Sequence, residues 1–418
     1  MKKNFYIFIL ILAAVFCAGC SDEAAVQEQA PEMAAVVITT EEAPGDDYII
    51  ANVSAPGVDE QAEIKLRGNS TREVEKKAYT IKFEDELSFL DMEAGKKWAL
   101  VSDPFDKSLL RPVIGFTFAQ QLGLDYVSQT RLCKVWLNDV YMGVYTVMEP
   151  VEAGKGRVEI DPDDGDFLLE RNMDRQEDDV VYMESSGGLR FEFNEPEEPD
   201  AAQQEQCFDM LQAVENAIFS GDHEQYEQLI DIESFVNFYI FHEVIKDVDF
   251  GEYSTRYYFK DGVFYAGPPW DLDLTMGNVA KERDEFKYGS YNNDGDSSCG
   301  MWASSSDYYY WLCRDPWFME KVERRWSEVS KIAENLAEDN KHGTNLIDQY
   351  VGAYREELES NYTEAGYVGI DCWTVDEPAH MLEWQQPADT YTGNVELLRE
   401  WLIKRVEYLD KEFGNKLF

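Results

Sequence analysis

The most informative stretch of the chain is Ala266-Gly267-Pro268-Pro269-Trp270-Asp271-Leu272-Asp273, which follows directly on a short apolar run. Its two carboxylates lie two residues apart, and residues i and i+2 of an extended strand point to the same side. Asp271 and Asp273 are therefore expected to face one cavity together. A bound cation would relieve their repulsion, and carboxylate oxygens suit Mg²⁺ or Mn²⁺ better than zinc. The pair predicts a metal-dependent reaction on a phosphate, with a solvated acidic turn as the alternative interpretation.

A β-hairpin is predicted immediately before this stretch. Its strands are expected over 253–260 and 263–266, and Asp261-Gly262 between them is a strong turn signal. A helix is predicted over 232–245 from its near-helical apolar spacing, with His242 as a core residue. A second acidic cluster, Asp247-Val248-Asp249, lies between this helix and the hairpin. The two acidic clusters are thus separated by one hairpin.

The remaining chain is predicted to be β-rich first and helical second. Alternating or β-branched segments predict strands over 62–67, 79–83, 98–101, 132–137, 143–148, 166–170, 180–183 and 189–193. Apolar periodicity and caps predict helices over 107–122, 203–219, 315–336, 345–361 and 395–413. Residues 281–306 are rich in Gly, Ser, Asn and Asp and predict a long loop. We therefore expect one two-lobed α+β unit, with a β-rich first lobe and a mainly helical second lobe.

The composition indicates a folded, strongly acidic protein. The chain has 418 residues, of which 44% are hydrophobic and 14% aromatic, and its formal net charge is −46. Such a charge argues against nucleic acid as a partner, and it would attract a protein substrate rich in Lys and Arg. The seven Cys include no CxxC spacing and there are only four His, so neither a zinc site nor a disulfide framework is predicted.

The N-terminus has the pattern of a leader. Lys2 and Lys3 precede an apolar run over 5–16, and Cys17-Ala18-Gly19-Cys20 closes it. Small residues before Cys20 are similar to a bacterial lipobox, in which that Cys is acylated; an ordinary cleaved signal peptide is the alternative. We expect a lipoprotein signal peptide over 1–20, a flexible linker over 21–44 and a folded domain over 45–418. Acyl chains would hold the protein outside the cytoplasm, on the cell membrane of a bacterium.

Ordered segments along most of the chain carry a family resemblance. They are 64–72, 76–83, 106–111, 135–138, 143–149, 249–258, 267–278, 315–318, 324–326 and 398–413. Together they resemble the CotH kinase family, the atypical kinase-like proteins named for a bacterial spore-coat protein. The similarity spans about residues 60–413. It implies a two-lobed atypical protein-kinase-like fold that uses ATP with Mg²⁺ or Mn²⁺.

The resemblance implies a nucleotide site in the β-rich part. The turn Arg67-Gly68-Asn69-Ser70 would contact phosphate oxygens through the planar fork of Arg67. One of Lys77 and Lys82 would reach the nucleotide. Tyr145 and Trp270 are candidates for stacking on adenine, with core aromatics as the alternative. Glu149 is a candidate polar contact at the nucleotide edge, or a carboxylate that bridges the two lobes.

The resemblance also implies roles for the acidic clusters. The first family Asp maps best to Asp249, with Asp247 as the fallback, and would orient or deprotonate the acceptor hydroxyl. Asp271 would bind the metal, with Asp273 nearby. The family usually has Asn or a small polar residue after the first Asp, whereas this chain has Phe250-Gly251-Glu252. Ser254 or Arg256 is expected to take over part of that polar role.

The expected function is that of an exported, monomeric protein kinase. It would transfer the γ-phosphate of ATP to Ser or Thr of a spore-coat or cell-envelope protein, one that is Lys/Arg/Ser-rich. The first alternative is a catalytically inactive kinase-like surface protein that acts in binding or as a scaffold. The second is a carbohydrate-active enzyme that uses paired carboxylates such as Glu149 with Asp271.

Overall fold

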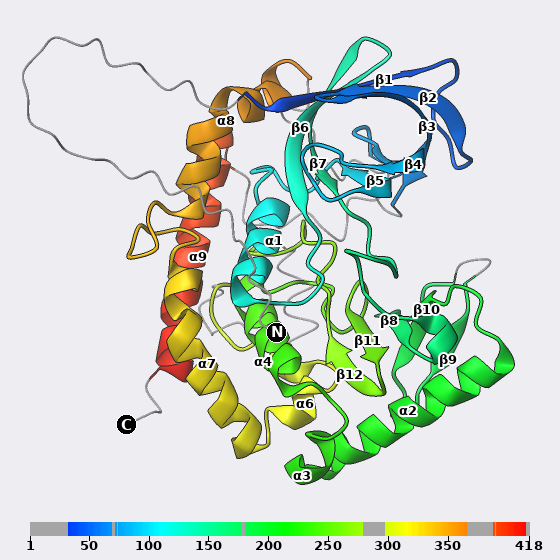
Figure 1. The fold of residues 1–418 in the computed structure, drawn as a ribbon. Helices are drawn as coiled ribbons and strands as arrows, with labels where there is room; N and C mark the ends of the chain where they lie inside the picture. The colour runs from blue at the N-terminus through cyan, green and yellow to red at the C-terminus, as the bar shows by residue number, and fades with distance from the viewer. Residues whose placement is uncertain are drawn as a thin grey trace, which may run out of the picture.

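The barrel is the first structural unit of the chain. The computed structural model describes residues 32–68, 72, 74–176, 180–278, 297–365, 388 and 390–414. Seven described strands close in the order β1-β2-β3-β4-β5-β7-β6 (Figure 1). They are β1 (Ala34–Thr40), β2 (Ile49–Ala55), β3 (Val58–Arg67), β4 (Ala78–Leu87), β5 (Gly95–Val101), β6 (Thr130–Leu137) and β7 (Val140–Met148). Parallel pairing of β1 with β6 closes the ring, while the other described pairs are antiparallel.

Strand β1 corrects the predicted linker. Residues 34–40 were expected to be flexible, but they form β1, in which Val36 and Ile38 point into the barrel and are fully buried. Neither β1 nor β2 was predicted, although the β-branched run Val36-Val37-Ile38-Thr39-Thr40 favours a strand. The folded domain therefore begins before residue 45. The leader, Cys20 and the earlier part of the predicted linker lie outside the described residues.

As predicted, the described chain from residue 201 onward is mainly helical, but it also adds two strands to a second sheet. Its order is β12-β11-β8-β10-β9, and the described pairs in it are antiparallel. The strands are β8 (Phe167–Arg171), β9 (Tyr182–Glu184), β10 (Arg190–Glu195), β11 (Arg256–Lys260) and β12 (Val263–Ala266). Each of these strands was predicted from the sequence, but the sequence did not predict that they pair in one sheet. The hairpin β11–β12 returns to pair with β8, so segments about ninety residues apart meet next to the acidic clusters.

The helices fill the space beside and between the two sheets. They are α1 (Arg111–Leu122), α2 (Ala201–Ser220), α3 (His223–Tyr226), α4 (Ile232–Ile245), α6 (Tyr309–Leu312), α7 (Pro316–Glu334), α8 (Leu346–Thr363) and α9 (Tyr391–Phe413), with 3-10 turns η2 (Pro162–Asp164) and η3 (Ala303–Ser305). α1 packs against β6 and α4, and α4 packs against β12, so these two helices join the barrel to the second sheet (Figure 1). None of the described helices combines the length and apolar character needed to cross a bilayer.

Local sequence explains where the helices begin and end. Asp200 and Gln203 form a capping box at the start of α2, and the Asp231 side chain caps α4. Gly123 ends α1 in the left-handed conformation that glycine adopts most easily. α1 begins at Arg111 and not at residue 107 as predicted, because Asp106 and Ser108 form a hydrogen-bonded turn before it. The predicted 315–336, 345–361 and 395–413 helices are confirmed as α7, α8 and α9 with small shifts at their ends.

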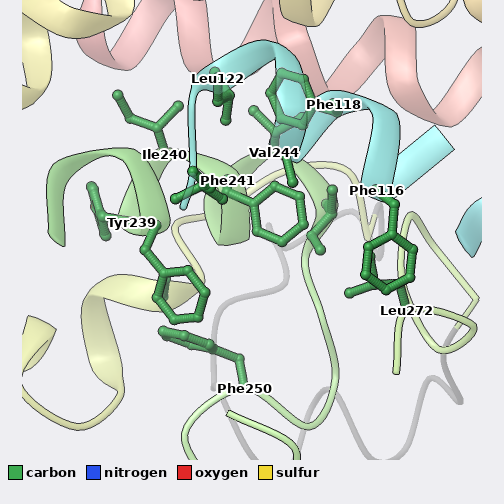
Figure 2. Packing of buried hydrophobic residues seen from close by; sticks show 14 of the residues in the cluster. Phe116, Phe118, Leu122, Tyr239, Ile240, Phe241, Val244, Phe250 and Leu272 are labelled. Atoms are coloured by element: carbon green, nitrogen blue, oxygen red, sulfur yellow. The ribbon is translucent and has the colours of Figure 1, made fainter. Parts of the chain in front are cut away.

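The hydrophobic core positions the segment that follows β12. The barrel has its own interior cluster, and a larger cluster joins α1, α4 and the second sheet. Figure 2 shows Leu272 next to Phe116 of α1, with Phe241 of α4 nearby. Gly115 lets α1 approach this leucine closely, since a Cβ placed there would lie 2.7 Å from Leu272 Cδ1. Burial of Leu272 therefore fixes the two aspartates on either side of it.

Candidate active site

A cavity of about 230 Å³ lies where the barrel, α1 and the second sheet meet. The loop after β5, the end of β3, strand β8 and two loops of the second half all contribute to its wall. Apolar residues such as Phe116 and Met148 form part of the wall. The polar and charged residues that line it are Arg67, Asp103, Glu170, Arg175, Asp249, Ser254, Asp271 and Asp273. Five carboxylates and two guanidinium groups thus share one hollow, a set suited to binding phosphate together with cations.

Asp271 and Asp273 both line the cavity, but not for the reason that the sequence suggested. β12 ends at Ala266, and Asp271 has a left-handed φ of +56° in place of the expected extended conformation. The two carboxylates reach one cavity because Leu272 between them is buried in the core. Asp103 and Ser254, which also line the cavity, have φ values of +47° and +53°. Unusual backbone conformations of this kind gather at functional sites.

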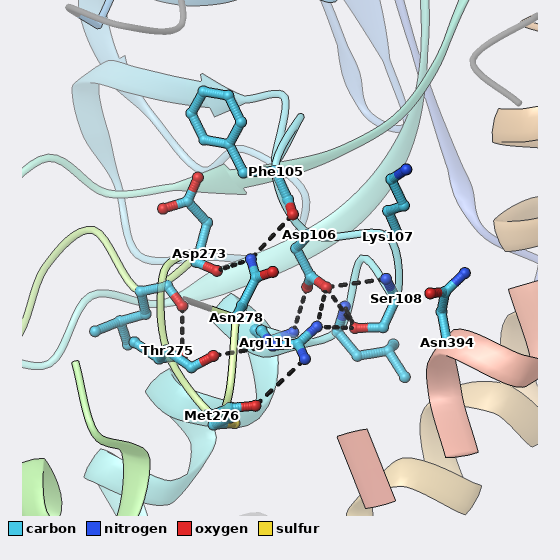
Figure 3. Close-up of polar contacts among 12 residues, drawn as sticks. Phe105, Asp106, Lys107, Ser108, Arg111, Asp273, Thr275, Met276, Asn278 and Asn394 are labelled. Carbon is cyan, nitrogen blue, oxygen red and sulfur yellow. Dashed lines mark hydrogen bonds and ion pairs between the residues drawn. The ribbon is translucent and has the colours of Figure 1, made fainter. Parts of the chain in front are cut away.

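A buried polar network fixes the 271–278 segment against the start of α1 (Figure 3). The Arg111 guanidinium pairs with Asp106 at 2.6 Å and donates to the carbonyl oxygens of Thr275 at 3.0 Å and Met276 at 3.3 Å. The Asn278 amide donates to the carbonyl oxygens of Phe105 at 3.0 Å and Asp273 at 2.6 Å. Arg111 is therefore a structural cation here, and the loop after β5 is tied directly to the acidic loop after β12.

Asp249 reaches the cavity from the loop that follows α4. Lys246 ends the helix in the left-handed conformation, and the Asp249 amide donates to the Asp247 carboxylate at 3.0 Å. Asp247 itself is buried beside His242, with 3.6 Å between Oδ2 and Nδ1, and it does not line the cavity. His242 packs on Phe250 with 4.0 Å between ring centres, so it is a core residue as predicted. The geometry favours Asp249 over Asp247 as the functional carboxylate.

The carboxylates of the cavity repel one another. Burial raises the pKa of Asp271, and the nearby Asp249 raises it further, while Arg67 and Arg256 act in the opposite direction. Asp271 is exposed to solvent where it lines the cavity. Burial followed by the charge of Asp271 raises the pKa of Asp273 well above its usual value. Burial also raises the pKa of Asp103 to about 7 and that of Glu170 to about 7.

Arginines and a tryptophan form the cationic side of the site. The guanidinium groups of Arg67 and Arg256 lie 5.3 and 5.1 Å from the Trp270 ring centre. Arg256 also pairs with Glu170 at 2.5 Å. Burial lowers the pKa of Arg67 to about 10, and the charge of Asp271 counteracts part of that effect. Arg67 stays cationic at neutral pH, and a guanidinium is a group that binds phosphate oxygens well.

Four predicted nucleotide contacts do not line this cavity. Tyr145 is fully buried in the barrel interior, where its hydroxyl donates to the Lys77 carbonyl oxygen at 2.8 Å. Lys77 donates to the Arg72 carbonyl oxygen, and Lys82 forms a half-exposed pair with Glu63 at 3.5 Å. Glu149 pairs with Arg157 at 2.5 Å and accepts from the Gln129 amide at 2.8 Å, away from the cavity. The suggested glycosidase pair of Glu149 with Asp271 is therefore not assembled.

Sequence reasoning missed Asp103, Glu170 and Arg175, and it mentioned Arg256 only as a substitute. Glu170 and Arg256 each carried a readable signal, because each is a charged residue within or next to a run of apolar and aromatic residues in a strand. A charge in such a position needs a partner, and the two residues are partners of each other. Asp103 and Arg175 lie in loops and had no comparable signal in the sequence.

The donor set fits a hard divalent cation in chemical type. Within the described residues there is no preassembled group of three Asp, Glu, His or Cys side chains that could hold a metal ion. Mg²⁺ commonly binds through one or two carboxylates and completes its shell with substrate phosphates and water. Asp271 and Asp273 supply oxygen donors of that kind, and their mutual repulsion is the property that a cation would relieve.

Two comparisons with known proteins bear on this geometry. The family model described as CotH kinase protein matches residues 64–409, which is most of the chain and includes both acidic loops, Arg67 and most of α9. A search of the curated proteins finds no match.

Proposed function

The chain belongs to the CotH kinase family, and from that premise we propose that it is an atypical protein kinase that transfers the γ-phosphoryl group of ATP to Ser or Thr hydroxyls. The barrel would serve as the N-terminal lobe of a two-lobed kinase-like fold, and the second sheet with its helices as the C-terminal lobe. The observation that carries the proposal is the cavity between them, in which Asp249 and Asp271 face Arg67.

Each group of the cavity has a chemical task in this proposal. Arg67 binds phosphate oxygens through its planar fork of donors. Trp270, which already lies beside two guanidinium groups, offers an aromatic face to the purine. Asp271 and Asp273 would hold Mg²⁺ or Mn²⁺, which supplies neutralisation of phosphate charge when bound. Arg175 at the edge of the cavity adds positive charge close to Asp271.

In this proposal, the Asp249 carboxylate accepts the proton of the acceptor hydroxyl. This carboxylate accepts a hydrogen bond from the Ser or Thr hydroxyl and directs the oxygen at the γ-phosphorus. The new bond forms between that oxygen and phosphorus, and the bond from phosphorus to the β,γ-bridging oxygen breaks, so that ADP leaves. The hydroxyl proton passes to the Asp249 carboxylate and then to water. Positioning and charge neutralisation supply most of the rate in transfers of this type.

An intact-mass measurement tests the proposal. The full chain is incubated with ATP and Mg²⁺ or Mn²⁺, alone and with Ser/Thr peptides, and every product is weighed. A gain of about 80 Da per site identifies phosphoryl transfer. A nucleotide-sized gain would replace the proposal with nucleotidyl transfer. Binding of nucleotide without any gain would support the inactive binding or scaffold protein.

We also propose that the protein is lipid-anchored outside the cytoplasm and acts on envelope or spore-coat proteins as a monomer. The leader pattern that ends at Cys20 supports the anchor. The net charge of −46 supports a substrate rich in Lys, Arg and Ser. Cys20→Ser should release the protein from the membrane fraction of a bacterial host. A basic peptide should be phosphorylated faster than a neutral one at low salt, and the difference should shrink as salt is added.

A further inference from the structure

The carboxylate of Asp103 is one of three charged groups of the cavity, with Glu170 and Arg175, that neither the sequence motifs nor the family resemblance pointed to. It lies two residues after β5, on the barrel side, with only 2% of its surface exposed. One oxygen, Oδ2, accepts from the Thr146 hydroxyl at 2.6 Å. The other, Oδ1, is buried and has no hydrogen-bond partner in the part of the chain that the structure describes. Burying a carboxylate oxygen without a hydrogen-bond partner costs free energy, and a bound ligand that supplies the partner removes that cost.

The surroundings of Asp103 indicate what kind of ligand is missing. Asp103 lines the cavity together with Asp271 and Asp273, and these three negative groups destabilise each other's charge. Asp106 adds to this repulsion as well, although Arg111 pairs with it at 2.6 Å. Lys76 of the barrel acts on the pKa of Asp103 in the opposite direction, while its amino group donates to the Val144 carbonyl oxygen and lies over the Tyr145 ring.

The like charges cannot simply move apart. Asn278 ties the carbonyl oxygens of Phe105 and Asp273 together, and Arg111 ties Asp106 to the carbonyl oxygens of Thr275 and Met276 (Figure 3). The loop that carries Asp103 and the loop that carries Asp271 and Asp273 are thus held face to face. A fold that keeps carboxylates together in this way is stabilised by a cation placed among them.

We propose that Asp103 is the barrel-side partner of the divalent cation and accepts hydrogen bonds from water bound to it. The inference rests on the proposed kinase function and extends it, since the ion then connects the barrel to the loop after β12. Mg²⁺ keeps several of its waters in protein sites, so Asp103 acts without being one of a preassembled group of three ligands. Carboxylates in such outer positions typically contribute 10- to 100-fold to metal affinity.

Asp103→Asn tests this proposal, because it removes the charge and keeps the size and the acceptor for Thr146. Mn²⁺ binding to the full chain is measured by electron paramagnetic resonance with a non-hydrolysable ATP analogue at pH 8. Thermal melts are recorded in EDTA and with Mn²⁺. We expect about 10-fold weaker Mn²⁺ binding or more. We also expect a melting temperature in EDTA that equals or exceeds that of the wild type, because a repulsive charge is gone. Asp163→Asn, an exposed carboxylate in η2, is the matched control and should change neither quantity.

The outcomes separate this inference from the kinase proposal. Equal Mn²⁺ affinity of Asp103→Asn and wild type would overturn the role of Asp103 and leave the kinase proposal standing. A variant that already loses stability in EDTA, or fails to fold, would identify a purely structural carboxylate and would also overturn it. Absence of Mn²⁺–nucleotide binding by the wild type would overturn both.

Discussion

The barrel and the second half of the chain, residues 149–414, use their polar side chains in different ways. In the barrel, two of the predicted functional residues do not line the cavity: Tyr145 fills the interior and Lys82 pairs with Glu63 on the outside. In the second half, Asp249 and Asp271 both reach the cavity. The barrel contributes charged groups to the site only beyond or at the ends of its strands, as with Arg67 and Asp103. The side chains of barrel strands fill the interior or cover the outside, and functional groups come from strand ends and loops.

Asp271→Ala should produce the largest effect and tests the functional half of this comparison. Loss of the carboxylate that faces Arg67 and Asp249 should remove detectable phosphoryl transfer, because it removes an oxygen donor for the cation. The fold should persist, since Leu272 still anchors the loop in the core. Transfer is measured with labelled ATP and Mn²⁺, and the fold by circular dichroism. Glu63→Ala on the barrel surface is the control and should keep its activity; a fully active Asp271→Ala would remove this residue from the site.

Asp249→Asn should lower the rate of transfer by about 10²–10⁴, the usual contribution of a general base. Asn keeps the size of the side chain and its place next to Asp247, but it accepts a proton poorly. Nucleotide affinity should change little, which a calorimetric titration with Mg²⁺ and an ATP analogue would show. A variant with a normal rate constant and a raised KM for ATP would instead assign Asp249 to nucleotide binding.

Arg405→Met should have the largest effect on stability and lies entirely within the second half. Arg405 is fully buried, pairs with Glu243 at 2.8 Å and donates to the Gly300 carbonyl oxygen at 2.7 Å. Removing it leaves the Glu243 carboxylate buried without its counter-ion, which costs about 3–5 kcal/mol. Urea unfolding measures the loss. Arg355→Ala removes an exposed pair with Glu359 in the same half, and it should cost less than about 1 kcal/mol.

Trp270→Ala and Tyr145→Phe compare the two aromatic residues expected to contact adenine. Trp270 lies in the cavity wall and Tyr145 in the barrel core, so only the first should matter for the nucleotide. Trp270→Ala should weaken binding of an ATP analogue by about 1–3 kcal/mol. Tyr145→Phe should leave the affinity unchanged and slightly lower stability through loss of its bond to the Lys77 carbonyl oxygen. Weaker nucleotide binding by Tyr145→Phe would show that the barrel interior affects the affinity of the cavity for the nucleotide.

These contrasts explain what the sequence could predict. The helix α4 and hairpin β11–β12 have strong local signals, so the segments that carry Asp249 and Asp271 were found. The barrel is closed by pairing of β1 with β6, about a hundred residues apart, and no local pattern reports such a contact. Period-two alternation separates the two faces of a strand but does not say which face meets the cavity. Lys82 and Tyr145 were therefore assigned by motif and not by position, whereas Asp103 lay in a loop without a motif.

Lys82→Ala should have the smallest effect and tests the structural half of the comparison. Its amino group is half-exposed and 3.5 Å from Glu63, and pairs of this kind contribute about 0–1 kcal/mol. We therefore expect an ATP affinity within about twofold of the wild type, which corresponds to less than about 0.5 kcal/mol. Arg67→Ala on the neighbouring strand β3 is the matched comparison and should raise the KM for ATP, because Arg67 lines the cavity. If Lys82→Ala weakened nucleotide binding as much as Arg67→Ala does, the nucleotide would have to contact the outer face of the barrel.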